Sequence, residues 1–103
     1  MLLRPPLRGR AMTIAEFEAE DSQAFEGVLL ALWWDAKGDW VKAHEIAQDM
    51  ESVDGAWVHA YLHRKEGDVG NAAYWYRRAG RRVAAGDLRL EWEGIVGEIL
   101  GRG

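Results

Sequence analysis

Residues 55–85 read GAWVHAYLHRKEGDVGNAAYWYRRAGRRVAA, and this stretch decides the fold. The pair Gly67-Asp68 divides it into two segments. Glycine commonly follows the last turn of a helix, because it tolerates the left-handed backbone conformation. Aspartate caps the next helix by accepting a hydrogen bond from its free N–H groups. The pair therefore predicts one helix over 55–66 and another over 69–85, joined by almost no loop.

The same pair recurs along the chain and sets the other helix boundaries. It appears again as Gly38-Asp39 and Gly86-Asp87, and Asp54, followed by a glycine, predicts one more turn with Asp54 as the cap. Two further helices are then expected over about 40–52 and over 88–100. A first segment is expected to end at Ala36 and to start either at Thr13, with a break near Asp21, or at Ser22.

Apolar residues recur at spacings of three and four within each segment, which is typical of amphipathic helices. Ala72, Trp75, Tyr76 and Ala79 are an example. Short turns force consecutive helices to pack antiparallel. We therefore predict an all-α fold of four or five short antiparallel helices, arranged as two helix-turn-helix units and a C-terminal capping helix.

The chain contains an internal repeat. Laying Gly38-Asp39 on Gly67-Asp68 also lays Ala43 on Ala72. The run of Gly67-Asp68-Val69 with Ala72, Tyr76 and Ala79, preceded by the small residue Ala60, resembles the second half of a tetratricopeptide repeat. The resemblance covers about residues 27–80. It implies binding of a protein or peptide in a groove, and it implies no catalysis.

Composition narrows the class of protein. The chain has 103 residues, a formal net charge of −4 and no cysteine. That length corresponds to one domain with one core. The negative charge argues against general affinity for nucleic acid or for anionic membranes. Without cysteine there are no disulfides and no thiolate metal sites, which fits a cytoplasmic protein.

The first residues, MLLRPPLRGRAM, are expected to form a disordered N-terminal tail over 1–12, with a single helical domain over 13–103. Their apolar stretches are too short for the core of a signal peptide. A second interpretation takes Met12 as the natural start of the protein.

All three histidines lie on two consecutive predicted helices. When these helices fold back on each other about a turn near 53–54, His44 comes to lie opposite His63, and Gln48 opposite His59. The next turn then sets Asn71 near His63 and Trp75 near His59. Helical spacing adds Glu66 and Arg78 to the same faces. The candidate ligand-binding residues are therefore His44, Gln48, His59, His63, Glu66, Asn71, Trp75 and Arg78.

Three interpretations of this cluster remain open. The polar groups could satisfy each other as part of the structure. They could form a pocket for a small polar ligand or peptide, with Trp75 stacking on it. Finally, His59 and His63, at positions i and i+4, have the spacing of helical metal ligands, with His44 as a third ligand. Residues 59–63 read HAYLH and lack the glutamate of the HExxH protease motif.

The sequence thus favours a non-catalytic binding module of tetratricopeptide-like type, with no catalytic residue and no cofactor expected. Its partner would be a protein or peptide, and a second copy of the chain is one candidate, through Trp33, Trp34 and Trp92. The alternative is a small metal-dependent or histidine-using enzyme with its site at His44, His59 and His63, holding a divalent metal such as zinc.

Overall fold

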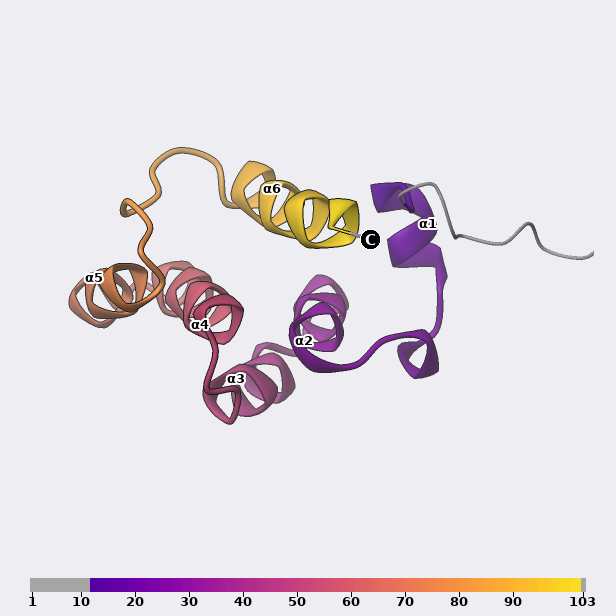
Figure 1. Ribbon diagram of the computed structural model, residues 1–103, viewed down its shortest axis with the longest axis horizontal. Coiled ribbons are helices and arrows are strands. Elements are labelled where there is room, and N and C mark those ends of the chain that lie inside the picture. Colours follow the sequence, from indigo (N-terminus) through magenta and orange to yellow (C-terminus); the bar gives the residue numbers. More distant parts are fainter. Residues whose placement is uncertain (1–11, 103) are drawn as a thin grey trace, which may run out of the picture.

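The computed structural model describes residues 12–102 (Figure 1). All regular secondary structure in this part of the chain is helical, with no strand, which confirms the predicted all-α class. Its elements in chain order are α1 (Ile14–Ala19), the short 3-10 helix η1 (Ser22–Ala24), α2 (Gly27–Ala36), α3 (Trp40–Gln48), α4 (Val53–Lys65), α5 (Val69–Arg78) and α6 (Leu88–Gly101).

The helices form two consecutive hairpins, α2 with α3 and α4 with α5, and α3 packs against α4. Helix α6 returns over the hairpins and contacts both α2 and α4, while α1 closes against α2 and α6 (Figure 1). The stretch 53–65 therefore has neighbours on several sides. This central position of α4 places its side chains between the other elements.

The predicted turns at Gly38-Asp39 and Gly67-Asp68 are confirmed. Gly38 and Gly67 have φ angles of 89° and 90°, in the left-handed region that favours glycine. The carboxylates of Asp39 and Asp68 then accept hydrogen bonds from backbone N–H groups of α3 and α5. The same chemistry at Gly86 begins α6, where Asp87 caps the helix.

The predicted cap at Asp54 is wrong. Helix α4 begins earlier, because the Ser52 hydroxyl accepts a hydrogen bond from the Gly55 N–H at 2.9 Å. Serine caps a helix about as well as aspartate, and here the serine comes first. Asp54 lies in the first turn of α4 and instead pairs with Arg102. Helix α3 accordingly ends at Gln48 and does not reach residue 52.

The predicted helix over 69–85 is too long. Helix α5 ends at Arg78, and Gly80 follows in the left-handed conformation with φ 68°. The N–H of Arg81 closes the end by bonding to the Tyr76 carbonyl at 2.9 Å. The following segment leads to α6, and in it Arg81 packs its guanidinium 3.6 Å from the centre of the Trp57 ring.

The first predicted segment is interrupted, which raises the number of α-helices in residues 12–102 to six. The start at Thr13 is confirmed, since Thr13 and Glu16 form a capping box at the beginning of α1. The break near Asp21 is confirmed, since Asp21 caps η1. Met12, expected in the tail, is half-buried and packs against the core. The rest of the predicted tail, residues 1–11, and residue 103 lie outside the described residues.

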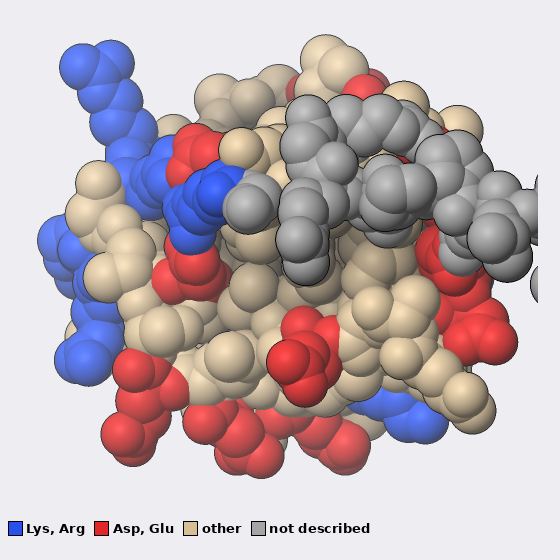
Figure 2. Space-filling view, turned by 45° about the vertical axis from the view of Figure 1, so that its right-hand side comes forward, with Lys and Arg blue, Asp and Glu red and all other residues tan. Residues whose placement is uncertain are grey.

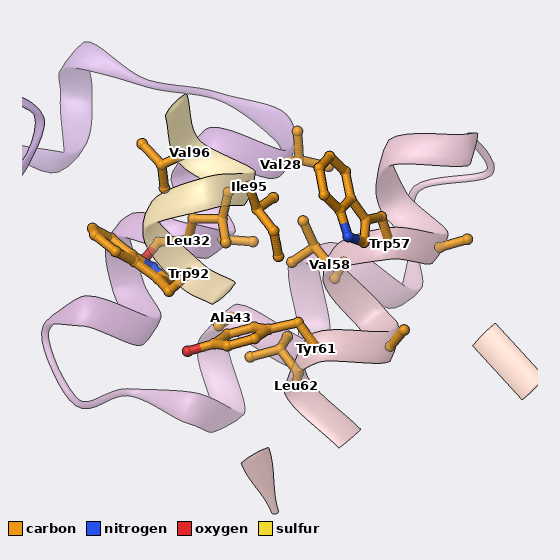
Figure 3. Close-up of a cluster of buried hydrophobic side chains, with 14 of the residues drawn as sticks. Val28, Leu32, Ala43, Trp57, Val58, Tyr61, Leu62, Trp92, Ile95 and Val96 are labelled. Atoms are coloured by element: carbon orange, nitrogen blue, oxygen red, sulfur yellow. The ribbon is translucent and has the colours of Figure 1, made fainter. Parts of the chain in front are cut away.

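The core lies between α6 and the two hairpins (Figure 3). Leu32, Val58, Leu62 and Val96 are fully buried. The small residues of the repeat pattern also lie inside; their side chains are at most 1% exposed, and they are Ala31, Ala43, Ala60 and Ala72. Small side chains of this kind let helices approach closely.

The tryptophans that were expected to provide a surface for a second copy belong mostly to the core. Trp92 is only 2% exposed, and its indole N–H donates to the Leu32 carbonyl at 3.0 Å. Trp33 is also buried, and its indole N–H bonds to the Glu20 carbonyl. Trp34 is half-buried. These rings fill the space between short helices, so they offer little exposed apolar surface to a partner.

Both signs of charge are spread over the surface. Figure 2 shows one face on which Lys and Arg gather mainly at the left with Asp and Glu among them, while further Asp and Glu lie along the lower edge and at the right. Among residues 12–102, no helix combines the length and the apolar character needed to cross a bilayer.

Candidate functional site

Three imidazole rings meet between α3 and α4. The Nε2 atoms of His44 and His59 lie 3.0 Å apart. The ring of His63 is centred 5.1 Å from that of His44 and 4.7 Å from that of His59. One ring nitrogen from each residue can be chosen so that all three lie within 4.8 Å of one another. The packing of α3 against α4 thus brings together the three histidines that the sequence placed on facing helices.

The partners within this cluster differ in detail from the expected pairing. His44 was expected to face His63, but it makes its hydrogen-bond contact with His59. His59 and His63 are one helical turn apart on α4, so their rings stack side by side with an angle of 28° between them. His44 then reaches both rings from α3.

Trp40 is a member of the site that sequence reasoning missed. Its ring stacks on His44 with centroids 4.8 Å apart and an angle of 9°. Its indole N–H donates to the Leu62 carbonyl at 2.8 Å, which ties the start of α3 to the end of α4. The available signal was its position four residues before His44, on the same helical face.

Glu66 joins the cluster through His63. The Nδ1 atom of His63 lies 2.7 Å from Glu66 Oε1. An ionised carboxylate only accepts hydrogen bonds, so Nδ1 is the nitrogen that carries the proton. In the neutral form of the ring that donates from Nδ1, the second nitrogen of His63, Nε2, keeps its lone pair. His63 itself is buried, whereas Glu66 reaches solvent.

Trp75 stacks on a histidine. Its ring lies 4.1 Å from that of His59, with an angle of 27° between the planes. The guanidinium of Arg78 lies 5.5 Å from the same indole and also contacts Tyr74. The expected role of Trp75 as a stacking surface for a ligand is therefore already taken, on one face, by His59.

Asn71 is the candidate that is not placed with the histidines. Its backbone N–H and its side-chain amide both bond to the Asp68 carboxylate, at 3.2 and 3.3 Å. Asn71 lies in the first turn of α5, where the cap competes for its polar groups. It is exposed and belongs to the structure of the turn.

The environment keeps two of the imidazoles uncharged. Burial lowers the pKa of His59 to about 4, with further lowering from the neighbouring His63 and His44. Burial also lowers the pKa of His44, followed by the effect of His63. Removing an imidazolium from water is costly, and close like charges add repulsion. At neutral pH His44 and His59 are therefore neutral rings with one lone pair each.

An open cavity of about 590 Å³ lies beside the cluster, at the end of α3, the start of α4 and the end of α5. Its lining residues are Ala47, Gln48, Met50, Glu51, Ser52, Val53, Ala56, His59, Trp75 and Arg78. Gln48 and His59, which were expected to face each other, both line it. His59 belongs to the cavity wall and to the histidine cluster alike, so it connects the two features.

A second polar group lies on the other side of α4 and was not predicted. The buried carboxylate of Asp35 accepts hydrogen bonds from the Tyr61 hydroxyl at 2.8 Å and from Lys65 Nζ at 2.9 Å. Burial, and then the Asp35 charge, raise the pKa of Tyr61. Both carboxylate oxygens are satisfied, so this group serves to join α2 to α4.

Comparison with protein-family models, with curated proteins and with solved structures finds no match to this chain. The function must therefore be inferred from the geometry of the cluster and the cavity.

Proposed function

We propose that the protein is a non-catalytic binding module, and that its cavity takes a small polar ligand or a peptide segment carrying a carboxylate. One observation carries this proposal. Four of the candidate residues, namely Gln48, His59, Trp75 and Arg78, line a single cavity of about 590 Å³. Ligand pockets in proteins commonly measure about 300–1,000 Å³, so the space suits a small molecule or a few residues of a peptide.

The chemistry of the walls selects the ligand. The guanidinium of Arg78 contacts the aromatic rings of Tyr74 and Trp75, and it pairs with no carboxylate within residues 12–102. Arginine binds carboxylates through two parallel hydrogen bonds. The amide of Gln48 offers both a donor and an acceptor. Met50 and Ala56 supply apolar contacts to the remainder of the ligand.

Binding is favoured over catalysis by the state of the hydroxyl at the cavity. Ser52 lines the cavity, but its oxygen accepts the hydrogen bond that caps α4. A serine nucleophile needs a base within hydrogen-bond reach of its hydroxyl, and Ser52 instead has a structural contact. The tandem hairpins and the tetratricopeptide-like motif support the same class of function, a protein or peptide binder. The absence of cysteine supports the cytoplasm as its location.

The proposal is tested by NMR titration of the ¹⁵N-labelled protein with two matched sets of short peptides, one with a free C-terminal carboxylate and one amidated. We expect the free acids to shift the amide signals of Gln48, Glu51 and Arg78 and the indole signal of Trp75. The amidated peptides should bind at least about tenfold more weakly, because charge-assisted bonds to arginine contribute about 1.5 kcal/mol or more.

Arg78→Gln should lose the preference for the free acid. Arg77→Gln is the matched control, because Arg77 is an exposed neighbour on α5 that does not line the cavity. Equal binding of acid and amide, an unchanged preference in Arg78→Gln, or shifts confined to residues away from the cavity would each contradict the proposal.

A further inference from the structure

We propose that His44, His59 and His63 bind one divalent transition-metal ion, of the class of zinc, cobalt and nickel, through three imidazole nitrogens. This metal site lies beside the cavity described above, and His59 belongs to both. Four observations carry the inference: the spacing of the nitrogens, the orientation of His63 by a carboxylate, the stacking that holds the other two rings, and the chemistry of the ligand set.

The nitrogens are already close to the spacing that a metal needs. Two imidazole nitrogens at about 2.0–2.1 Å from a tetrahedral zinc ion lie about 3.3 Å from each other. His44 Nε2 and His59 Nε2 are 3.0 Å apart, so they need to separate by only a few tenths of an ångström. Nitrogens of all three residues lie within 4.8 Å of one another, so a modest rotation of His63 completes the set.

His63 is oriented in the way that metal ligands usually are. In protein metal sites, the second nitrogen of a ligating histidine is commonly held by a carboxylate, which fixes the ring and raises its basicity. Glu66 holds His63 Nδ1 at 2.7 Å. That contact leaves Nε2 as the donor atom available to an ion. Glu66 is therefore a positioning residue in this proposal.

The other two rings are held in place by stacking. His44 lies flat against Trp40, and His59 lies against Trp75, with centroids 4.8 and 4.1 Å apart. Each indole restricts rotation of the imidazole it covers. A site whose ligands are fixed before the ion arrives loses less conformational freedom when it binds. A purely structural histidine pair would need only the single His44–His59 hydrogen bond and not the carboxylate on the third ring.

The ligand set selects the class of ion. Imidazole nitrogens suit zinc, nickel, copper and cobalt, whereas magnesium and calcium prefer oxygen ligands. Three protein ligands leave a fourth position open to water or a small anion. A second group nearby could compete for the metal ion, because oxygens of Glu66 and Asp68 lie within 4.8 Å of a nitrogen of His63. Its two carboxylates are exposed, and the experiment separates this group from the three-histidine site.

The test uses the full chain, purified without a histidine tag and freed of metal with a chelator. Cobalt(II) is titrated while visible absorption is recorded, and zinc is then added in competition and its stoichiometry measured by calorimetry. We expect one equivalent of metal per chain and the intense visible bands of a tetrahedral cobalt site. Magnesium and calcium should not displace the cobalt. Weak octahedral bands, or no binding at one equivalent, would overturn the proposal.

Variants locate the site and separate it from its alternatives. His44→Ala changes a half-exposed residue and should weaken zinc binding by more than the 10–100-fold that is expected for loss of a supporting carboxylate in Glu66→Ala. Glu66→Gln, whose amide oxygen still accepts from Nδ1, should restore part of the affinity. If His44→Ala binds zinc as the parent does, the three-histidine site does not exist.

Two controls complete the design. Asp68→Asn keeps a capping side chain on α5 but removes the competing carboxylate, so zinc affinity should not change. Arg77→Gln, which changes an exposed arginine of α5 outside the cavity, should also leave zinc affinity unchanged. A loss of zinc binding in Asp68→Asn with normal binding in His44→Ala would assign the ion to the competing group. Far-UV circular dichroism verifies that each variant is folded.

Discussion

Replacing Gly55 by alanine tests the close approach between the end of α3 and the start of α4. An ideal Cβ at Gly55 would lie 2.3 Å from the Met50 carbonyl oxygen and 2.8 Å from the Met50 Cβ. Both separations are shorter than real Cβ contacts allow, and one of the atoms belongs to the backbone. The turn between the two helices must therefore shift to accept a methyl group.

The magnitude follows from two opposing effects. Alanine is favoured over glycine inside a helix by about 0.5–1 kcal/mol. Overpacking at a site that cannot relax costs about 1–3 kcal/mol and sometimes more. We therefore expect Gly55→Ala to lower the free energy of unfolding by about 1–2 kcal/mol. Gly94→Ala is the matched control, because Gly94 lies inside α6 and a Cβ there meets nothing within 4 Å. It should raise the free energy of unfolding by about 0.5–1 kcal/mol.

Urea denaturation followed by far-UV circular dichroism measures both variants, and thermal melting gives a second scale. A difference of about 2 kcal/mol between the two variants corresponds to a difference in Tm of roughly 8 °C or more for a domain of this size. If Gly55→Ala is as stable as Gly94→Ala, the Met50 carbonyl does not lie against the start of α4. The assignment of Ser52 as the cap of α4 would then fail with it.

Three further outcomes are expected. Ala72→Leu enlarges a side chain that is 1% exposed where α4 meets α5, and should lower the free energy of unfolding by about 1–3 kcal/mol. An unchanged urea midpoint would mean that the two helices are not closely packed. Asp35→Ala leaves the Tyr61 hydroxyl and Lys65 without their buried acceptor and should lower the free energy of unfolding by about 2–4 kcal/mol. Adding Tyr61→Phe should recover part of this loss. If the two substitutions change the free energy of unfolding additively in urea denaturation, Asp35 and Tyr61 do not interact. The metal-free protein should lose stability as pH falls from about 6.5 to 4, because the pKa of His59 is lowered from 6.5 to about 4 and only the unfolded chain takes up the proton in that window. Discounted for the solvent that screens His59 at the open cavity, the loss is about 1 kcal/mol by pH 5, and His59→Gln should reduce it in urea denaturation at pH 7 and pH 5.

The helix boundaries show how far local chemistry can be read from the sequence. The turns at Gly38, Gly67 and Gly86 are visible because a left-handed glycine and an aspartate cap act within one helical turn. The start of α4 was misplaced because Ser52 and Asp54 are both good caps, and only the folded chain shows which one is used. The end of α5 was misplaced because no aspartate follows Gly80 to mark the start of another helix.

The sequence by itself determined the helical class, the packing of consecutive helices from α2 to α5, and the meeting of His44, His59 and His63 between α3 and α4. Each of these depends on helical spacing and on turns between neighbouring segments. The tertiary structure decided the partner of each ring. His59 lies between His44 and Trp75, Glu66 holds His63, and Asn71 remains with its cap. These choices depend on side-chain packing among α3, α4 and α5. A periodic pattern specifies which face a residue occupies, and it leaves open which neighbour on that face its side chain contacts.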